Sequence, residues 1–295
     1  MNGLTIRHGL EYGALRVLLC LIDSLPPAAS GWLIRRAADL WYGLDGSRRR
    51  VAIENIQRSG VAAGPRTAKT LARESFRHFG MVVLESLTSA RVFNCENWRE
   101  KVQIDLPPET EALLNDPNRG MIVVSGHLGN WEIAAQLVSH WKPVVGVTRP
   151  MNNPYVERLV QRRKPQNNFR LTPKHDANAL RFLGDLKRGD ILALLIDQHA
   201  GRHGVQIDFF GSPASTHTTP AMLHLVTKAP LVFGVCIRTG PMSYRFKASE
   251  PIVHPPTGDR ESDVRAIMDR INDLLERAIR EHPGQYLWGH RRWRE

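Results

Sequence analysis

One short segment combines residue types that can perform acid–base chemistry with a spacing that suits it. Ser125-Gly-His-Leu-Gly-Asn-Trp-Glu132 contains His127 and, five residues later, Glu132. A neutral imidazole can remove the proton from an attacking hydroxyl, and a carboxylate on its other ring nitrogen fixes the tautomer and stabilises the imidazolium that forms. The pair therefore predicts general-base catalysis, which contributes on the order of 100- to 10,000-fold.

The same spacing of a histidine and a carboxylate occurs four times in the chain, so context must decide which pair carries chemistry. The other pairs are His203/Asp208, His254/Asp259 and His290/Glu295. Only His127 follows a continuous apolar run, 121–124, and precedes a helical pattern. That context predicts a position at the carboxyl end of a sheet strand, where open α/β sheets bind ligands. A structural role stays open, in which His127 hydrogen-bonds within the turn and Glu132 complements the helix N-terminus.

Other familiar sites are missing from the sequence. It contains no G-x-x-x-x-G-K-[ST], G-x-G-x-x-G, G-x-S-x-G or H-E-x-x-H motif, which disfavours a P-loop, a dinucleotide site, a serine nucleophile elbow and a zincin. The three cysteines are far apart and form no cluster with histidines, so neither a disulfide framework nor a structural zinc site is expected.

Nearly continuous apolar runs alternate with helical patterns through most of the chain. Such runs are typical of strands covered on both faces, and their alternation with helices predicts an α/β fold with a mostly parallel central sheet flanked by helices. The predicted strands are 121–124, 144–148, 191–196 and 231–237, and the predicted helices are 130–141, 155–164, 177–187, 220–228 and 264–281. We expect an α/β domain over 101–295, preceded by a helical, membrane-facing part over 1–100.

The N-terminal segment is amphipathic. Apolar residues recur at helical spacing over 10–25, where Glu11, Arg16 and Asp23 interrupt them, and a second such stretch covers 32–42. The interior charges argue against a cleavable signal peptide, and no stretch reaches the roughly 18 apolar residues of a membrane span. These helices either lie in a membrane interface, with arginines at the headgroups, or belong to the protein core.

The charge balance predicts an anionic partner. The 295 residues carry 40 Lys+Arg against 29 Asp+Glu, a formal net charge of +11. Residues 149–188 alone hold ten basic and three acidic residues. Nucleic acid, an anionic membrane surface and a phosphorylated substrate all fit such a balance.

The order and spacing of several blocks resemble the bacterial lipid A biosynthesis acyltransferases, of the lauroyl and myristoyl type, within the lysophospholipid and glycerolipid acyltransferases. The likeness extends from about Tyr12 to Trp293. It rests on Arg50-Val-Ala-Ile-Glu-Asn-Ile56, Gly126-His-Leu-Gly-Asn-Trp-Glu132, Val147-Thr-Arg-Pro150 with Asn153-Pro154, Ile196-Asp-Gln198, Asp208-Phe-Phe-Gly211 and Gln285-Tyr-Leu-Trp-Gly-His-Arg-Arg-Trp293.

The resemblance implies transfer of a fatty acyl chain from acyl carrier protein, which holds it as a thioester, to a hydroxyl of a phosphorylated glycolipid such as a lipid A precursor. It makes His127 the general base and Glu132 its orienting carboxylate, and it needs neither a metal nor an organic cofactor. It also implies a peripheral or monotopic enzyme on the cytoplasmic face of the inner membrane. The residues that it implies in substrate binding or in support of the site are Asn130, Arg149, Arg163 and Asp197.

Three alternatives stay open at the level of sequence. The acceptor could be another membrane glycolipid, such as a phosphatidylinositol mannoside, or a lysophospholipid. A hydrolase could use the same pair to activate water. A noncatalytic basic protein could bind a membrane or nucleic acid through 149–188, but nucleic acid is disfavoured because this segment has few interleaved aromatic residues and no nucleic-acid-binding motif.

Overall fold

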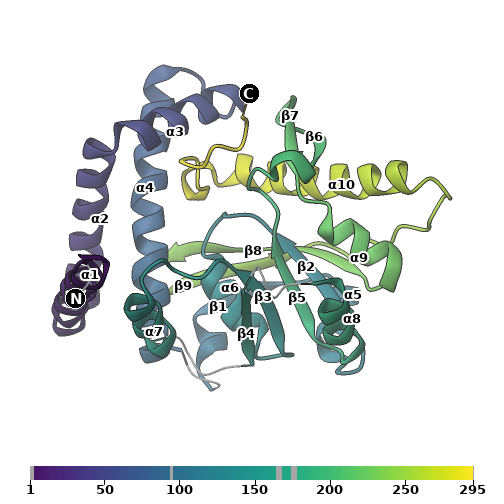
Figure 1. Cartoon of the computed structure of the whole chain (residues 1–295), viewed down its shortest axis with the longest axis horizontal. Coiled ribbons are helices and arrows are strands. Elements are labelled where there is room, and N and C mark those ends of the chain that lie inside the picture. The colour runs from purple at the N-terminus through teal and green to yellow at the C-terminus, as the bar shows by residue number, and fades with distance from the viewer. Residues whose placement is uncertain (1–2, 94–95, 164–167, 174–177, 295) are drawn as a thin grey trace.

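The structure is a computed structural model that describes residues 3–93, 96–163, 168–173 and 178–294. A mostly parallel sheet lies at its centre with helices packed on it, and the N-terminal helices stand at one end of the molecule (Figure 1). The α/β fold class predicted from the sequence is confirmed.

The central sheet has the strand order β1-β9-β8-β2-β5-β3-β4. Neighbouring strands are parallel except β8 and β9, which form an antiparallel hairpin. Its strands are β1 (Val102–Asp105), β2 (Met121–Ser125), β3 (Val144–Thr148), β4 (Phe169–Pro173), β5 (Ile191–Leu195), β8 (Leu231–Gly240) and β9 (Ser243–Ala248). A separate antiparallel hairpin consists of β6 (Val205–Phe209) and β7 (Ser212–Thr216).

Alternation along the strands divides the core into two layers. Met121 of β2 packs in one cluster with Ile133, while the next residue, Ile122, packs in another cluster with Ile267. Successive side chains of a strand point to opposite faces, so helices must cover both faces of this sheet. The helices after the N-terminal part are α5 (Pro108–Asn115), α6 (Trp131–Val138), α7 (Pro154–Arg163), α8 (Ala179–Lys187), α9 (Thr219–Thr227) and α10 (Arg260–Glu281).

The N-terminal helices share a hydrophobic core with the sheet. They are α1 (Gly3–Ser24), α2 (Pro27–Leu44), α3 (Gly46–Arg58) and α4 (Pro65–Thr88). Ile56 of α3 and Phe76 of α4 pack in one cluster with Val235 of β8, Leu275 of α10 and Trp288. The expected boundary near residue 100 thus crosses a continuous core, and the division into two domains stays a prediction.

The first helix is attached to the rest of the protein mainly through α7, beside which it lies in Figure 1. Asn153, just before α7, donates hydrogen bonds to the carbonyl of His8 (2.9 Å) and to Glu11 (3.0 Å). At the other end of α7, Arg163 forms a two-pronged ion pair with Asp23. Among the described residues, no helix combines the length and apolarity needed to cross a lipid bilayer.

Candidate active site

The strand register brings His127 and Asp197 together. Ser125, the last residue of β2, lies opposite Leu195, the last residue of β5. His127 and Asp197 each follow two residues later, so the chain delivers an imidazole and a carboxylate to the same place at the carboxyl edge of the sheet.

Asp197 holds His127 through two hydrogen bonds. The ring Nδ1 of His127 lies 2.8 Å from Oδ1, and the backbone N–H of His127 donates to Oδ2, also at 2.8 Å. An ionised carboxylate only accepts hydrogen bonds, so Nδ1 carries the proton and the lone pair of Nε2 is available to a substrate. The ring also packs edge-on against Trp131, 4.8 Å away between centroids. Both the tautomer and the orientation of the imidazole are therefore set.

Charges around the pair favour an ionised Asp197 and influence the protonation of His127. Burial acts to raise the pKa of Asp197, but the charge of His127, its two hydrogen bonds and the charge of Arg292 bring that pKa down to about 2. Burial acts to lower the pKa of His127, but Asp197 and, more weakly, Glu132 raise it above the ordinary histidine value. Asp197 is consequently a carboxylate at neutral pH. Its negative charge favours the protonated form of His127.

The position of Glu132 differs from the one the sequence predicts. The sequence predicts that Glu132 is the carboxylate on a ring nitrogen of His127, whereas the carboxylate on Nδ1 is Asp197. Glu132 lies in the first turn of α6 and lines the same cavity as His127. The carboxylate on Nδ1 follows the neighbouring strand β5, a relation that spacing within one segment cannot reveal.

Asn130 also has a different place from the one expected of a substrate-binding residue. Its side chain is completely buried. The amide oxygen accepts from the N–H of Ile133 and caps α6, and the amide nitrogen donates to Glu85 at 3.3 Å. Glu85 is itself buried and accepts hydrogen bonds from Arg238 and from the hydroxyl of Tyr244, both at 2.7 Å. Asn130 thus anchors the start of α6.

The two predicted arginines lie in different places. Arg149 is exposed and lines the cavity that contains His127. Arg163 points away from it, because its guanidinium pairs with Asp23 at 2.6 and 3.0 Å and its Nε donates to the carbonyl of Leu87. The structure therefore places Arg149 where it can meet a substrate and uses Arg163 to join α7 to α1 and α4.

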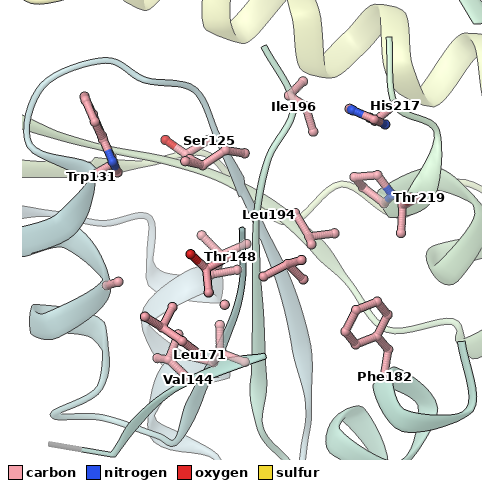
Figure 2. Close-up of a pocket in the computed structure, with 18 of the residues that line it drawn as sticks. Ser125, Trp131, Val144, Thr148, Leu171, Phe182, Leu194, Ile196, His217 and Thr219 are labelled. Carbon is pink, nitrogen blue, oxygen red and sulfur yellow. The ribbon is translucent and has the colours of Figure 1, made fainter. Parts of the chain in front are cut away.

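His127 lies at a cavity of about 1020 Å³, which is large for a small-molecule site. Figure 2 shows the side chains that surround it, with Val144 and Leu171 on one side of β5 and Phe182 on the other. The part under α6 is apolar and is lined by Val123, Ala134, Val138, Val144, Gly146, Leu171, Ala193 and Phe246. Polar side chains near the carboxyl edge include Ser125, Thr148, Gln198 and His217.

A distant segment near the C-terminus fixes the backbone of the His127 loop. The N–H of Leu287 donates to the carbonyl of His127 at 3.0 Å, and the N–H of Gly129 donates to the carbonyl of Gln285 at 3.1 Å. Gly129 has a φ of 63°, and a Cβ there would lie 2.1 Å from the carbonyl oxygen of Cys236, so only glycine fits. Residues 285–293 are one of the blocks on which the resemblance rests, and Gln285 and Leu287 within it hold the backbone of the His127 loop.

In the described part of the chain, no group of three or more His, Cys, Asp or Glu side chains is arranged to hold a metal ion. The arrangement can deprotonate a hydroxyl through Nε2 of His127 beside an apolar cavity. Comparison with known proteins identifies the family of the chain. The sequence model of one protein family, the bacterial lipid A biosynthesis acyltransferases, matches residues 7–295.

The chain belongs to this family.

Three relatives show the range within the family. The chain is 25% identical over 255 residues to the lipid A biosynthesis palmitoleoyltransferase of Escherichia coli K12, covering 84% of this chain and 79% of the relative. It is 24% identical over 254 residues, with the same two shares, to the lipid A biosynthesis lauroyltransferase of that organism. It is also 24% identical over 280 residues to the phosphatidylinositol mannoside acyltransferase of Mycolicibacterium smegmatis, covering 88% and 87%. The protein is therefore an acyltransferase of glycolipid metabolism, as the resemblance implied.

Proposed function

We propose that this acyltransferase moves a fatty acyl chain from acyl carrier protein to a hydroxyl of a phosphorylated glycolipid, a lipid A precursor, with His127 as the general base. The observation that carries the proposal is the imidazole of His127, held at Nδ1 by buried Asp197, beside an apolar cavity. Here Asp197, and not Glu132, is the orienting carboxylate.

The reaction needs two proton transfers through the same nitrogen. Nε2 of His127 takes the proton of the acceptor hydroxyl while the hydroxyl oxygen attacks the thioester carbonyl. The tetrahedral intermediate collapses, the carbon–sulfur bond breaks, and the imidazolium returns the proton to the leaving thiolate. Asp197 stabilises the imidazolium between these steps, and the charge of Glu132 acts in the same direction. Ester and thiol are formed, and the enzyme ends in its starting protonation state.

The apolar part of the cavity suits the acyl chain of the donor. One row of paired residues crosses β2, β5, β3 and β4 and lines the cavity beneath α6. The row consists of Val123, Ala193, Gly146 and Leu171. The two central members of the row are small, which leaves a channel between the sheet and the helix. The row lies two residues, or about 7 Å, deeper than Ser125 along the strand.

The acceptor is expected to reach the site from a membrane. The first two helices expose large apolar side chains. These are Leu10, Val17 and Leu21 of α1 and Trp32 and Leu40 of α2. A patch of this kind on an amphipathic helix is typical of binding in a bilayer interface. Because acyl carrier protein is a cytosolic donor, the relevant surface is the cytoplasmic face of the inner membrane.

Charge also fits a phosphorylated acceptor. Arg149 is exposed at the cavity and forms no ion pair in the described part of the chain. A guanidinium can bind a phosphate through two parallel hydrogen bonds, so Arg149 is suited to a phosphate of the acceptor. The acceptor lipid and the length of the transferred acyl chain can be read from the mass change of lipids extracted from cells with and without the gene.

The test of the proposal is acyl transfer by the variant His127→Ala. Purified enzyme is given lauroyl-acyl carrier protein and a bisphosphorylated lipid A precursor, and the acylated product is measured by mass spectrometry. We expect a loss of about 100-fold or more, with membrane binding and melting temperature unchanged. Transfer close to that of the wild type would remove His127 from the mechanism. Release of free fatty acid at the same rate without acceptor would instead identify a hydrolase.

A further inference from the structure

The cavity at His127 reaches both faces of the central sheet. Successive residues of β5 point to opposite faces, so Ala193 lines the part under α6 while Leu194 packs with the core on the other face. Leu194 and Ile196 line the same cavity. The cavity therefore continues past the carboxyl end of β5 to the face that α8 and α9 cover (Figure 2). This second lobe is lined by Phe182 of α8, Leu194 and Ile196 of β5, Thr219 and Met222 of α9, and Arg260 of α10.

The two parts of the cavity differ in polarity. Apolar side chains line the part under α6, whereas the second lobe combines apolar Phe182 and Met222 with the side chains of Thr218 and Thr219. The Thr218 side chain forms no capping hydrogen bond to α9, and a hydroxyl can both donate and accept. Arg260, the first residue of α10, is exposed and lines the lobe as well. The second lobe thus suits a ligand that carries amide groups along its length and a negative charge at its outer end.

An acyl thioester bound to a carrier protein has this form. Its reacting carbonyl lies in the middle of a long, linear molecule. The acyl chain extends from one side of the carbonyl, and from the sulfur on the other side extends a phosphopantetheine arm, which contains amide groups and ends in a phosphate. A donor with its carbonyl at His127 therefore needs an apolar space in one direction and a more polar space in the other. The cavity offers both, one on each face of β5.

The position of the second lobe also suits a soluble carrier protein. In Figure 1, α8 and α9 lie on the opposite side of the molecule from α1 and α2, whose exposed apolar side chains suit a bilayer interface. Arg149, the residue suited to an acceptor phosphate, lies between β3 and α7, and α7 packs against α1. Donor and acceptor can therefore reach His127 from different sides and be bound at the same time.

We propose that the second lobe binds the phosphopantetheine arm of the acyl donor, with Thr218 and Thr219 contacting its amide groups and Arg260 its phosphate. The inference rests on the proposed function, in which a thioester reacts at His127. An acyl chain of the acceptor is a poorer occupant, because it would bury these hydroxyls without a hydrogen-bond partner. The lobe then determines donor choice: a thioester without the arm keeps its reacting group and loses these contacts.

The experiment compares donors that carry the same lauroyl chain on arms of different length. Lauroyl-pantetheine has the arm without its phosphate, and S-lauroyl-N-acetylcysteamine keeps only the end next to the sulfur. Both are assayed with the bisphosphorylated lipid A precursor and full-length enzyme, either wild type or Met222→Trp, whose larger side chain should fill the lobe. We expect the wild type to prefer lauroyl-pantetheine in kcat/KM, and Met222→Trp to reduce this preference by about tenfold or more. Ala193→Leu, the matched control on the other face of β5, should keep the preference.

A second, independent measurement uses Arg260. Lauroyl-phosphopantetheine differs from lauroyl-pantetheine only in its phosphate, so the wild type should use it with the higher kcat/KM. Arg260→Gln should reduce that advantage by about tenfold, as expected for the loss of a charge-assisted contact. Arg265→Gln is the control, because Arg265 is an exposed arginine of the same helix that does not line the cavity. It should retain the advantage of the wild type.

The inference is overturned if the wild type uses lauroyl-pantetheine and S-lauroyl-N-acetylcysteamine equally well, or if Met222→Trp keeps the wild-type preference. A rise in the KM of the lipid A precursor with the donor preference intact would assign the lobe to an acyl chain of the acceptor and also overturn it. If Met222→Trp lowers the melting temperature, Thr219→Phe, at an exposed position of the same helix, replaces it in the comparison. If His127→Ala remains active, the proposed function has failed instead, so the two failures are distinguishable.

Discussion

Replacement of Asp197 by asparagine tests the central geometry most directly. In the wild type the two carboxylate oxygens accept from different groups, one from the ring Nδ1 of His127 and one from its backbone N–H. Asparagine has one acceptor oxygen and one N–H₂ group. The backbone N–H can only donate, so the amide oxygen must face it, and the N–H₂ group then faces Nδ1. Nδ1 is forced to accept, and the ring proton moves to Nε2, the nitrogen that should remove the substrate proton.

The size of the effect follows from that change of tautomer. Asp197→Asn keeps both hydrogen bonds but places the proton on the wrong nitrogen, so it should remove the full contribution of the base. We expect kcat to fall by about 1,000- to 10,000-fold, which corresponds to roughly 4–5.5 kcal/mol of transition-state stabilisation. Asp197 also raises the pKa of His127. Loss of its charge should therefore move the acid limb of the residual activity to lower pH.

The assay compares Asp197→Asn with Glu132→Gln in single-turnover acyl transfer from lauroyl-acyl carrier protein. Glu132→Gln removes the charge in the first turn of α6 and leaves Nδ1 bound to Asp197, so we expect a loss of less than about tenfold. Melting temperatures of both variants exclude unfolding as the cause. If Glu132→Gln were as inactive as His127→Ala while Asp197→Asn kept most of its activity, Glu132 would be the orienting carboxylate and the geometric reasoning would be refuted.

Three further predictions follow from other parts of the structure. Ala193→Leu should fill the channel under α6 and favour shorter acyl chains, measured by competition between acyl carrier proteins with different chains; unchanged preference would place the donor chain elsewhere. The pair Leu10→Asp and Val17→Asp should weaken binding to anionic vesicles in a flotation assay, unless these exposed side chains do not meet the bilayer. Asp39 has its pKa held below the usual range by Arg77, so it stabilises the fold above its ordinary pKa and loses that effect as the pH falls. Asp39→Asn should accordingly lower the melting temperature at pH 7, with a smaller difference from the wild type below about pH 4.

The parallel core could be predicted from sequence because its strands are buried on both faces and are therefore nearly continuous in apolar residues. The segments 121–124, 144–148, 191–196 and 231–237 correspond to β2, β3, β5 and β8. β4 was not predicted, and it lies at the edge of the sheet, where the exposed Arg170 interrupts the apolar pattern. β9 was also not predicted, because the core-facing Tyr244 and Phe246 alternate with the polar Ser243, Arg245 and Lys247 and form no continuous apolar run.

The site could be predicted only as far as local context reaches. The strand before His127 and the helix after it single out this histidine among the four candidates, and Asp197 is singled out through resemblance. The partnership between the two depends on β5 lying next to β2, although β3 and β4 separate them in the sequence.

The backbone hydrogen bonds that hold the His127 loop have a consequence for how the enzyme folds. Gly129 is joined to Gln285, and Asn130 to the carbonyl of Cys236, across separations of more than a hundred residues. Contacts this distant in sequence form slowly, because the chain between them must first be ordered. Refolding should thus restore helix content before it restores acyl transfer, and a protein that has regained its secondary structure can still be inactive.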